Sequence, residues 1–270
     1  MDNESVEFPR IDDLTQWIKL REEARTNPEG CGDYRIDDYR YCNVKREDDR
    51  VTKWIAENWR KRENTIPALC MARLFNQPRT LLRLGYPYDW DPELMMRRLE
   101  QMQASGLRIF NAAYIVSTNG KRMDKCEYVI WHVLDPIFKD RLRLEYAELE
   151  DCWRKLTTFT GMGSFIGAQV IADYKNCNWV NAPDHWTFVA PGPGSMRGLN
   201  RLRGLEAAAQ KYNQKSFSMY LQPLRGIIKA RTGLDLCAQD AQNCLCEFDK
   251  FMRLTLGEGR PKQKYSREGK

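Results

Sequence analysis

The sequence predicts a mostly α-helical fold with minor β content. Most long stretches place apolar residues three or four positions apart, which is the spacing of one face of an α-helix. Glycine and proline stand mainly between these stretches and not inside them. Alternation typical of strands is confined to one short segment, residues 108–118.

The composition is that of a globular protein, with 42% hydrophobic and 30% charged residues in 270. That length suits one large domain or two small ones. The segment 1–13 is acidic and polar, without the basic start and apolar stretch of a signal peptide. We therefore expect a cytoplasmic protein without a membrane partner. The net charge of +6 permits binding to a polyanion without requiring it.

The nine cysteines are expected to be free, buried thiols. Cys237, Cys244 and Cys246 form the densest group, but no C-x-x-C pair occurs and His132 and His185 are the two histidines. This is a poor ligand set for zinc or an iron–sulfur cluster. We expect no metal and no cofactor.

The first half of the chain predicts a helix in 12–27, another from Val44 to 63, and helical patterns over 66–84 and 91–106. In the last of these, Asp91 has the position of an N-cap, Pro92 that of the first helical residue, and Gly106 lies near the end. We expect an N-terminal extension over 1–33, a helical catalytic domain over 34–256 and a flexible basic tail over 257–270.

In the second half, Asn119-Gly120 after the β-like segment 108–118 predicts either a small hairpin or a turn between helices. Helices are then expected over 141–159, over 205–231 with a possible interruption at Pro223, and over 234–254.

Residues 157–172, TTFTGMGSFIGAQVIA, have the pattern of a helix-hairpin-helix element near 150–175. Gly161 and Gly163 allow a sharp turn and a close approach to a ligand. The amides that begin the next helix, near Ser164, favour an anion such as a DNA phosphate. An ordinary turn between two helices is the alternative, and the sequence leaves both open.

Residues 159–186 resemble the helix-hairpin-helix superfamily of DNA glycosylases, which carry a catalytic Asp at a similar distance beyond the hairpin. The resemblance implies a glycosylase-like helical fold and a catalytic role for Asp184, with His185 beside it as a secondary candidate. No Lys occurs between Thr158 and Tyr174, so Schiff-base lyase chemistry is not expected.

The Gly/Pro-rich segment 188–202 is a candidate phosphate or pyrophosphate cradle. Its polar groups are Ser195, Arg197, Asn200 and Arg201. The alternative is a rigid surface loop.

Two further polar groups have helical spacing. Asn43, Arg46, Glu47 and Arg50 would share one helix face, either at a site or as a solvated ion-pair face. A secondary group, spaced by seven and three, is either part of the same site or a set of structural ion pairs: Asp240, Glu247 and Lys250.

Three segments together, 39–55, 183–202 and 245–253, resemble the viral alpha-glutamyl/putrescinyl-thymine pyrophosphorylases, also called amino acid:DNA transferases of thymidine hypermodification. The resemblance runs from Tyr34 to Arg253 and extends to a helical domain of 5-hydroxymethyluracil DNA kinases. It implies a bacteriophage protein, acting in the infected bacterial cell, in which an amine displaces pyrophosphate from 5-pyrophosphoryloxymethyluracil in double-stranded DNA.

The implied partners are modified DNA, an amino acid or polyamine donor, and a 5-hydroxymethyluracil DNA kinase. Because no G-x-x-x-x-G-K-[ST] motif occurs, we expect the transferase and not the kinase. Under this reading Arg197, Arg201, Arg46 and Arg50 neutralise the pyrophosphate, and Asp184 or else Glu47 is the general base.

Ring-assisted departure of pyrophosphate is an alternative route, in which Asn43 or Asn200 would bind the base edge. Two other functions stay open: a DNA glycosylase, and a non-catalytic DNA-binding partner of the kinase.

Overall fold

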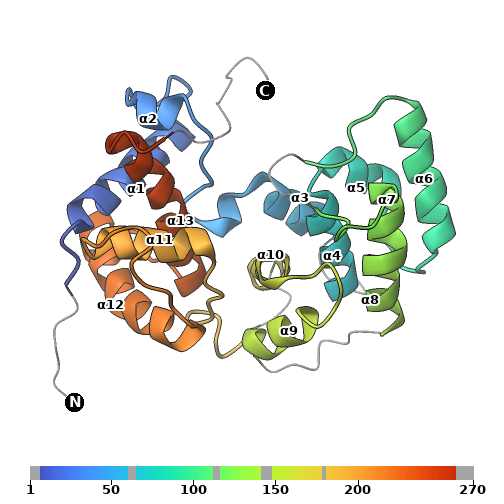
Figure 1. The fold of residues 1–270 in the computed structure, drawn as a ribbon. Helices are drawn as coiled ribbons and strands as arrows, with labels where there is room; N and C mark the ends of the chain where they lie inside the picture. The colour runs from blue at the N-terminus through green and yellow to red at the C-terminus, as the bar shows by residue number, and fades with distance from the viewer. Residues whose placement is uncertain (1–6, 60–64, 112–115, 141–147, 178–180, 260–270) are drawn as a thin grey trace. The chain divides into compact units, whose positions relative to one another are not determined.

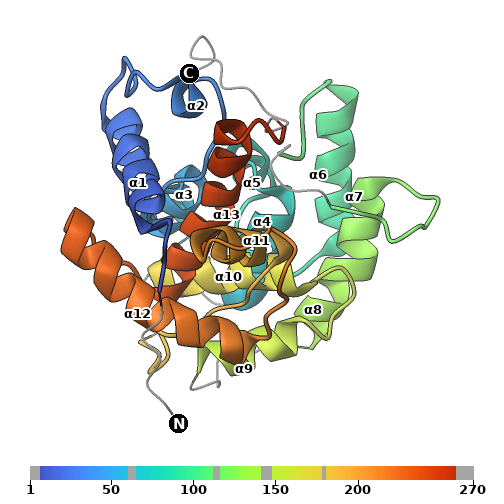
Figure 2. The same cartoon turned by 60° about the vertical axis from the view of Figure 1, so that its left-hand side comes forward.

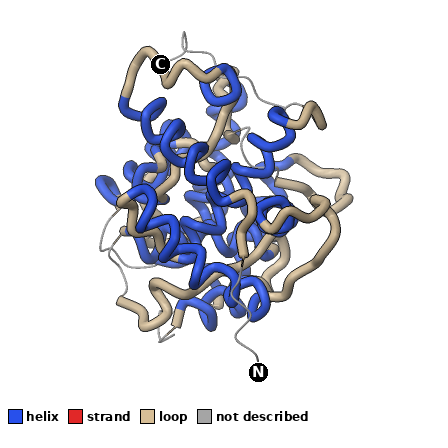
Figure 3. Tube along the Cα trace, turned by 90° about the vertical axis from the view of Figure 1, so that its left-hand side faces the viewer, coloured by secondary structure: helices blue, strands red, loops and turns tan. Residues whose placement is uncertain are grey.

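A computed structural model describes residues 7–59, 65–111, 116–140, 148–177 and 181–259. In these ranges the regular structure is helical, without a strand, and Tyr39 is an isolated bridge residue (Figure 3). The prediction of a mostly α-helical fold is confirmed. None of the helices in these ranges is both long and apolar enough to cross a membrane.

The chain divides into two compact units, and the division is discontinuous in sequence. The terminal unit consists of Met1–Asp49 and Trp186–Lys270, and the central unit consists of Arg50–His185. Figure 1 labels the helices of both. The segment 1–33, expected as an extension, contributes a helix to the core of the terminal unit.

The terminal unit is built around α13. Its helices are α1 (Ile11–Thr26), α2 (Tyr34–Asp37), α11 (Pro193–Leu202), α12 (Gln214–Thr232) and α13 (Ala238–Thr255), with a 3-10 turn at Arg46–Asp48. α1, α12 and α13 pack against one another (Figures 1 and 2). Trp17 of α1, Phe217 of α12 and Phe248 of α13 have no exposed surface and belong to one apolar core.

α11 and α13 approach closely because glycine removes a side chain between them. A Cβ on Gly198 of α11 would overlap the carbonyl oxygen of Leu245 on α13. Since that obstacle is backbone, it cannot rotate away as a side chain would. Glycine at this position therefore sets the distance between the two helices that carry most of the polar residues considered below.

The central unit surrounds α4 (Thr65–Phe75), every residue of which is buried. Around it lie α3 (Arg50–Asn58), α5 (Pro78–Leu84), α6 (Pro92–Ala104), α7 (Lys125–Glu127), a π-helical stretch (Tyr128–Leu134), α8 (Asp135–Lys139), α9 (Leu149–Leu156) and α10 (Ser164–Asn176). The expected start of α6 is confirmed, because the Asp91 side chain accepts a hydrogen bond from the Leu94 amide at 2.9 Å.

A buried ion pair joins three helices of the central unit. Arg73 on α4 donates from its Nε and Nη2 to the two carboxylate oxygens of Asp173 on α10, and from Nη1 to Asn76 Oδ1 at 2.9 Å. Thr52 of α3 accepts from Arg73 Nη2 and donates to Asp173 Oδ1, both at 2.7 Å. All four residues are buried. Each charge of this pair depends on the other, because water cannot take the place of a lost partner in the buried site.

Three expected helical stretches differ from the prediction. The stretch 66–84 is divided into α4 and α5 by Asn76 and Gln77. No single helix runs from Val44: a loop and the 3-10 turn precede α3, so Asn43, Arg46, Glu47 and Arg50 do not share a helix face. In this segment, side chains form hydrogen bonds with backbone groups that would bond to each other in a helix. Asn43 Nδ2 donates to the Asp48 carbonyl at 2.6 Å, and the Arg46 amide donates to Asp240 Oδ1 at 3.0 Å.

The helix expected over 205–231 begins only at Gln214. Asn200 Nδ2 binds the carbonyls of Ala207 and Gln210, which holds the preceding segment as a loop. Pro223 lies inside α12.

The described residues of 108–118 form no strand, and the minor β content was a wrong expectation there. Asn119 (φ 52°) and Gly120 (φ 79°) make a turn that leads into α7. Residues 112–115, 141–147 and most of the basic tail lie outside the described ranges.

We predict that Asp173→Asn lowers the free energy of unfolding by about 3–5 kcal/mol, because it leaves Arg73 buried without a counter-charge. Urea unfolding of the intact chain measures this. The control is Glu93→Gln, which removes a carboxylate that is 75% exposed and 3.8 Å from Arg97; it should cost less than about 1 kcal/mol. Equal, small losses for both variants would contradict the role of the buried pair.

Candidate functional site

Three arginines of the terminal unit converge on one buried carboxylate. Asp249 of α13 is 1% exposed. Its Oδ1 accepts from Arg201 Nε at 2.8 Å, and its Oδ2 accepts from Arg197 Nε at 2.9 Å, both from α11. Arg253, one turn further along α13, places its Nε 3.8 Å from the same Oδ2. A single carboxylate therefore orients guanidinium groups from two helices.

These three arginines differ in how much of the side chain is exposed and in the partners that it binds. The Arg201 side chain is 7% exposed, and its terminal amino groups bind both oxygens of Glu258, whose pKa is lowered by this contact. Arg197 and Arg253 are 42% and 33% exposed. Within the described residues, the one hydrogen bond of the Arg197 side chain is that to Asp249. Three cations thus face two carboxylates, and two of the three arginine side chains are partly exposed.

A second polar group on α13 is organised by Glu247, which is 2% exposed. Both of its carboxylate oxygens accept from Lys250 Nζ, at 2.7 and 2.8 Å, and Oε2 also accepts from the Cys42 amide at 3.2 Å. Burial, the largest single cause, lowers the pKa of Lys250, but the charge of Glu247, its hydrogen bond and the nearby Cys42 and Cys246 together raise it, and the net shift is upward. Lys250 is therefore held as an ammonium group.

The pKa shifts of two thiols indicate which charged groups lie near one another. The charge of Glu247, followed by burial of the sulfur, raises the pKa of Cys42, while Lys250 and Arg46 oppose the shift. Burial and then Glu247 raise the pKa of Cys246 to about 11, and Lys250 and Arg197 oppose it. Glu247, Lys250, Arg197 and Arg46 therefore lie in one electrostatic neighbourhood.

Loop 41–49 is fixed to this neighbourhood by contacts from α1 and α13. Arg21 of α1 donates to the Cys42 carbonyl at 3.1 Å and to Asn43 Oδ1. Asn243 of α13 donates to the Asn43 carbonyl at 3.1 Å. Together with the Arg46–Asp240 contact, these bring Asn43, Arg46 and Asp240 together. Glu47 instead is 63% exposed and pairs with Lys45 at 3.4 Å.

Ser195 and Asn200 hold the backbone of the Gly/Pro-rich segment. Ser195 is 2% exposed, and its hydroxyl bonds both the amide and the carbonyl of Gly192 at 3.0 Å, in a capping arrangement at the start of α11. Asn200 has no exposed surface; its Oδ1 accepts from the Tyr212 hydroxyl at 2.6 Å. The expected ligand contacts from these two side chains are wrong, because burial and internal partners occupy them.

In the central unit, α9 and α10 are joined by the predicted tight turn. Gly161 has φ +80°, and a Cβ there would lie 2.6 Å from Val133 Cγ2, so glycine is required. Met162 is fully buried and anchors the turn. Gly163 and Ser164 are exposed at the start of α10, which has 13 residues. The amides of this first helical turn lie at its positive dipole end.

Asp184 caps α9 from a distant part of the chain. Its Oδ1 accepts from the Leu149 amide at 2.9 Å, and its Oδ2 accepts from the Glu150 amide at 3.0 Å. His185 contributes its carbonyl, which accepts from the buried Lys175 Nζ at 3.4 Å. Asp184 forms this structural contact and is also partly exposed, so a ligand can reach it. Arg50 is exposed at the first residue of α3.

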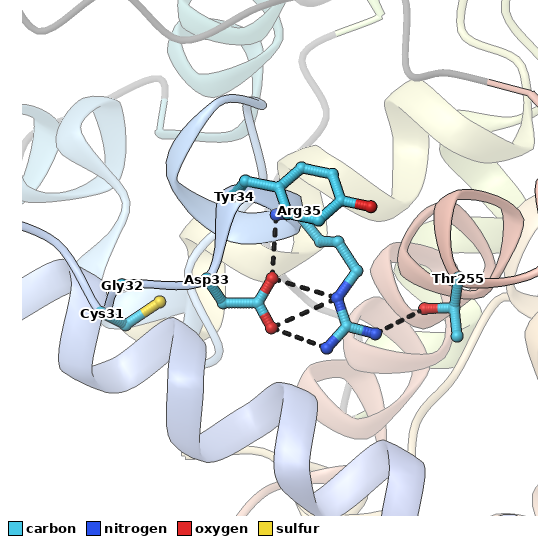
Figure 4. Close-up of a pocket in the computed structure, with 6 residues that line it drawn as sticks. All are labelled: Cys31, Gly32, Asp33, Tyr34, Arg35 and Thr255. Carbon is cyan, nitrogen blue, oxygen red and sulfur yellow. Dashed lines mark hydrogen bonds and ion pairs between the residues drawn. The ribbon is translucent and has the colours of Figure 1, made fainter.

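Sequence reasoning missed Arg253, Cys42 and a pocket beside α2. Arg253 follows Asp249 by four residues, and this ion-pair spacing is a signal that was available. The pocket has a volume of 490 Å³ and is shown in Figure 4. It is formed by Cys31, Gly32, Asp33, Tyr34, Arg35 and Thr255. Nothing in the spacing of the sequence joins Thr255 to the segment 31–35.

The cysteines are free, and six of them are buried as expected: Cys70, Cys126, Cys152, Cys177, Cys237 and Cys244. Among the described residues, no three His, Cys, Asp or Glu side chains are grouped as metal ligands.

We predict that Glu247→Gln lowers the pKa of Cys246, because it removes a negative charge while Lys250 and Arg197 stay in place. Alkylation of Cys246 by iodoacetamide at mildly alkaline pH should then be faster, by about tenfold for each pKa unit. Mass spectrometry of the Cys246 peptide measures the rate. Glu23→Gln, at an exposed position on α1, should leave the rate unchanged. An unaltered or slower rate in Glu247→Gln would contradict the charge grouping.

Comparison with known proteins gives one match. No curated protein and no solved structure matches this chain. A family model, described as the helical domain of 5-hmdU DNA kinase, matches residues 11–260. This range includes all the helices that the described residues form, so the match is not limited to a single motif. The chain belongs to the family of 5-hmdU DNA kinase helical domains.

Proposed function

We propose that this protein is a DNA-modifying transferase that replaces the pyrophosphate of 5-pyrophosphoryloxymethyluracil in DNA with an amine. Family membership supports a role in modification of 5-hydroxymethyluracil in DNA. The observation that carries the finer proposal is the convergence of Arg197, Arg201 and Arg253 on the buried Asp249.

The reaction requires a place for a leaving anion. The amine nitrogen forms a bond to the 5-methylene carbon, the bond from that carbon to the pyrophosphate oxygen breaks, and pyrophosphate departs with the electron pair. A base takes the proton that the attacking amine loses. Guanidinium groups suit the departing anion because they bind phosphate oxygens in a fixed fork. Groups held in place beforehand stabilise developing charge without reorganising.

Arg197 and Arg253 are the proposed pyrophosphate ligands, since their side chains are partly exposed and each forms an ion pair with Asp249. Arg201 is a positioning residue, because its terminal amino groups are bound to Glu258. Arg46 adds positive charge to the same neighbourhood, and Arg50 is a separate candidate on the central unit. Asn43 and Asp240 support the loop that carries Arg46.

The α9–α10 turn is the proposed DNA contact of the central unit. The exposed Gly163 and Ser164 place the first amides of α10 where a phosphate can accept from them, while Gly161 shapes the turn. Such a contact positions the backbone and reads no sequence. It suits an enzyme that must bring one modified base out of the stack.

Asp184 is the proposed general base. Its carboxylate is partly exposed, and its two oxygens are oriented by the amides of Leu149 and Glu150. Glu47 is a weaker proposal, because its carboxylate is 63% exposed and pairs with Lys45 at 3.4 Å. His185 and the Glu247–Lys250 pair are secondary candidates for moving a proton.

A second function is favoured by one observation, that the matching family is a domain of a kinase. In this reading the chain binds DNA and presents it to a 5-hydroxymethyluracil DNA kinase, without chemistry of its own. The cap that Asp184 forms on α9 is then its whole role.

The transfer is tested by incubating DNA that carries 5-pyrophosphoryloxymethyluracil with this protein and a pool of amino acids and polyamines. We predict a new nucleoside, heavier by one amine, with release of pyrophosphate. Arg197→Gln and Arg253→Gln should each reduce turnover by about 100-fold, as loss of an oxyanion donor does. Arg40→Gln removes the same charge at an exposed position and should retain activity. Unchanged DNA would favour the kinase partner, and abasic sites would identify a glycosylase.

Asp184→Asn separates catalysis from binding. Asparagine keeps one acceptor for the α9 amides and loses the basic carboxylate, so turnover should fall by at least about 100-fold while DNA affinity stays near that of the wild type. Nucleoside mass spectrometry and a DNA-binding titration measure the two quantities. A thermal melt monitors the cap on α9. Full turnover in the variant would remove Asp184 from the mechanism.

A further inference from the structure

The pocket beside α2 offers a charged pair to a small ligand. Asp33 is the N-cap of α2 and Arg35 lies two residues later, with Arg35 Nε 3.0 Å from Asp33 Oδ1 and Nη2 2.6 Å from Oδ2 (Figure 4). A volume of 490 Å³ is within the range of small-molecule sites. The pocket belongs entirely to the terminal unit.

The pair is held rigidly. Arg35 Nη1 donates to Thr255 Oγ1 at 2.9 Å, and the guanidinium lies over the Phe251 ring at 4.3 Å. Its contact with Asp33 lowers the pKa of that carboxyl group, which therefore stays ionised. A guanidinium has five N–H groups. The contacts to Asp33 and Thr255 use three, so two remain for a ligand.

One further group suits a polar ligand. Tyr34 is 62% exposed and presents its ring at the pocket.

We propose that this pocket binds the amine donor and that the donor is a zwitterionic α-amino acid. The ligand carboxylate takes the two remaining N–H groups of Arg35, and the ligand ammonium lies against Asp33 and the ring of Tyr34. One cation and one anion in the wall match a zwitterion. A dicationic diamine would place an ammonium group beside Arg35 with no second carboxylate in the lining. The identity of the ligand as donor rests on the proposed function.

Binding is measured without DNA, by isothermal titration calorimetry of the full chain. The probes are the twenty protein amino acids one at a time, putrescine, and the fragments acetate and methylamine. We expect at least one amino acid to bind more tightly than putrescine and than either fragment. Arg35→Gln should weaken that binding by about tenfold or more. Tyr34→Ala, at an exposed side chain that does not support the core, should weaken it about twofold to fivefold. Arg40→Gln is the matched control and should bind as the wild type does.

Absence of binding by every amino acid at millimolar concentration would overturn the proposal, as would tighter binding of putrescine or unchanged affinity in both Arg35→Gln and Tyr34→Ala. The transferase assay distinguishes failure of the proposed pocket from failure of the proposed function. Specific amino acid binding without transfer to DNA would leave the pocket standing and remove the proposed function. If Arg35→Gln still transfers the amine to DNA with an unchanged KM for the donor, the proposed function stands and the proposed role of the pocket is wrong.

Discussion

In each unit a buried carboxylate on one helix holds arginine from another, and the remaining structure is arranged around that constraint. In the central unit Asp173 of α10 holds Arg73 of α4. In the terminal unit Asp249 of α13 holds Arg197 and Arg201 of α11. A buried charge without its partner is strongly unfavourable, so the helices that carry these residues must stay in register. Gly198 contributes by letting α11 approach α13 closely enough for the contact.

The ion pairs of the two units differ in how much of the arginine side chains is exposed. Arg73 is surrounded by Asp173, Thr52 and Asn76, and its role is internal. Asp249 instead pairs with Arg197 and Arg253, whose side chains are partly exposed. The same interaction that fixes helix packing thus holds positive charge near the surface. A flexible arginine would lose more conformational freedom on binding an anion, whereas the Nε hydrogen bond to Asp249 has already restricted Arg197.

Local signals predicted what is determined locally. The N-cap of Asp91 and the glycine turn before α10 follow from neighbouring residues, and both were identified from the sequence. Loop 41–49 could not be predicted in this way, because its backbone is held by residues about two hundred positions away, as in the contact of the Arg46 amide with Asp240. Helical spacing of Asn43, Arg46 and Glu47 was therefore a coincidence of composition.

The site residues show the same limit. Arg197 and Arg201 were identified by their place in a Gly/Pro-rich segment, but Ser195 and Asn200 in that segment bind the backbone that shapes it. Side-chain type alone does not separate a residue that contacts ligand from one that holds a loop; burial does. Asp184 combines a structural contact with partial exposure.

The central claim is that Asp249 orients Arg197 and Arg253 as a pyrophosphate site. The most direct measurement is a phosphorus NMR titration of inorganic pyrophosphate with the wild type, with Arg197→Gln/Arg253→Gln and with Arg40→Gln. The account predicts a saturable change of the pyrophosphate signal with the wild type and with Arg40→Gln, and its loss in the double variant while the protein stays folded. The same saturable change in the double variant would contradict it.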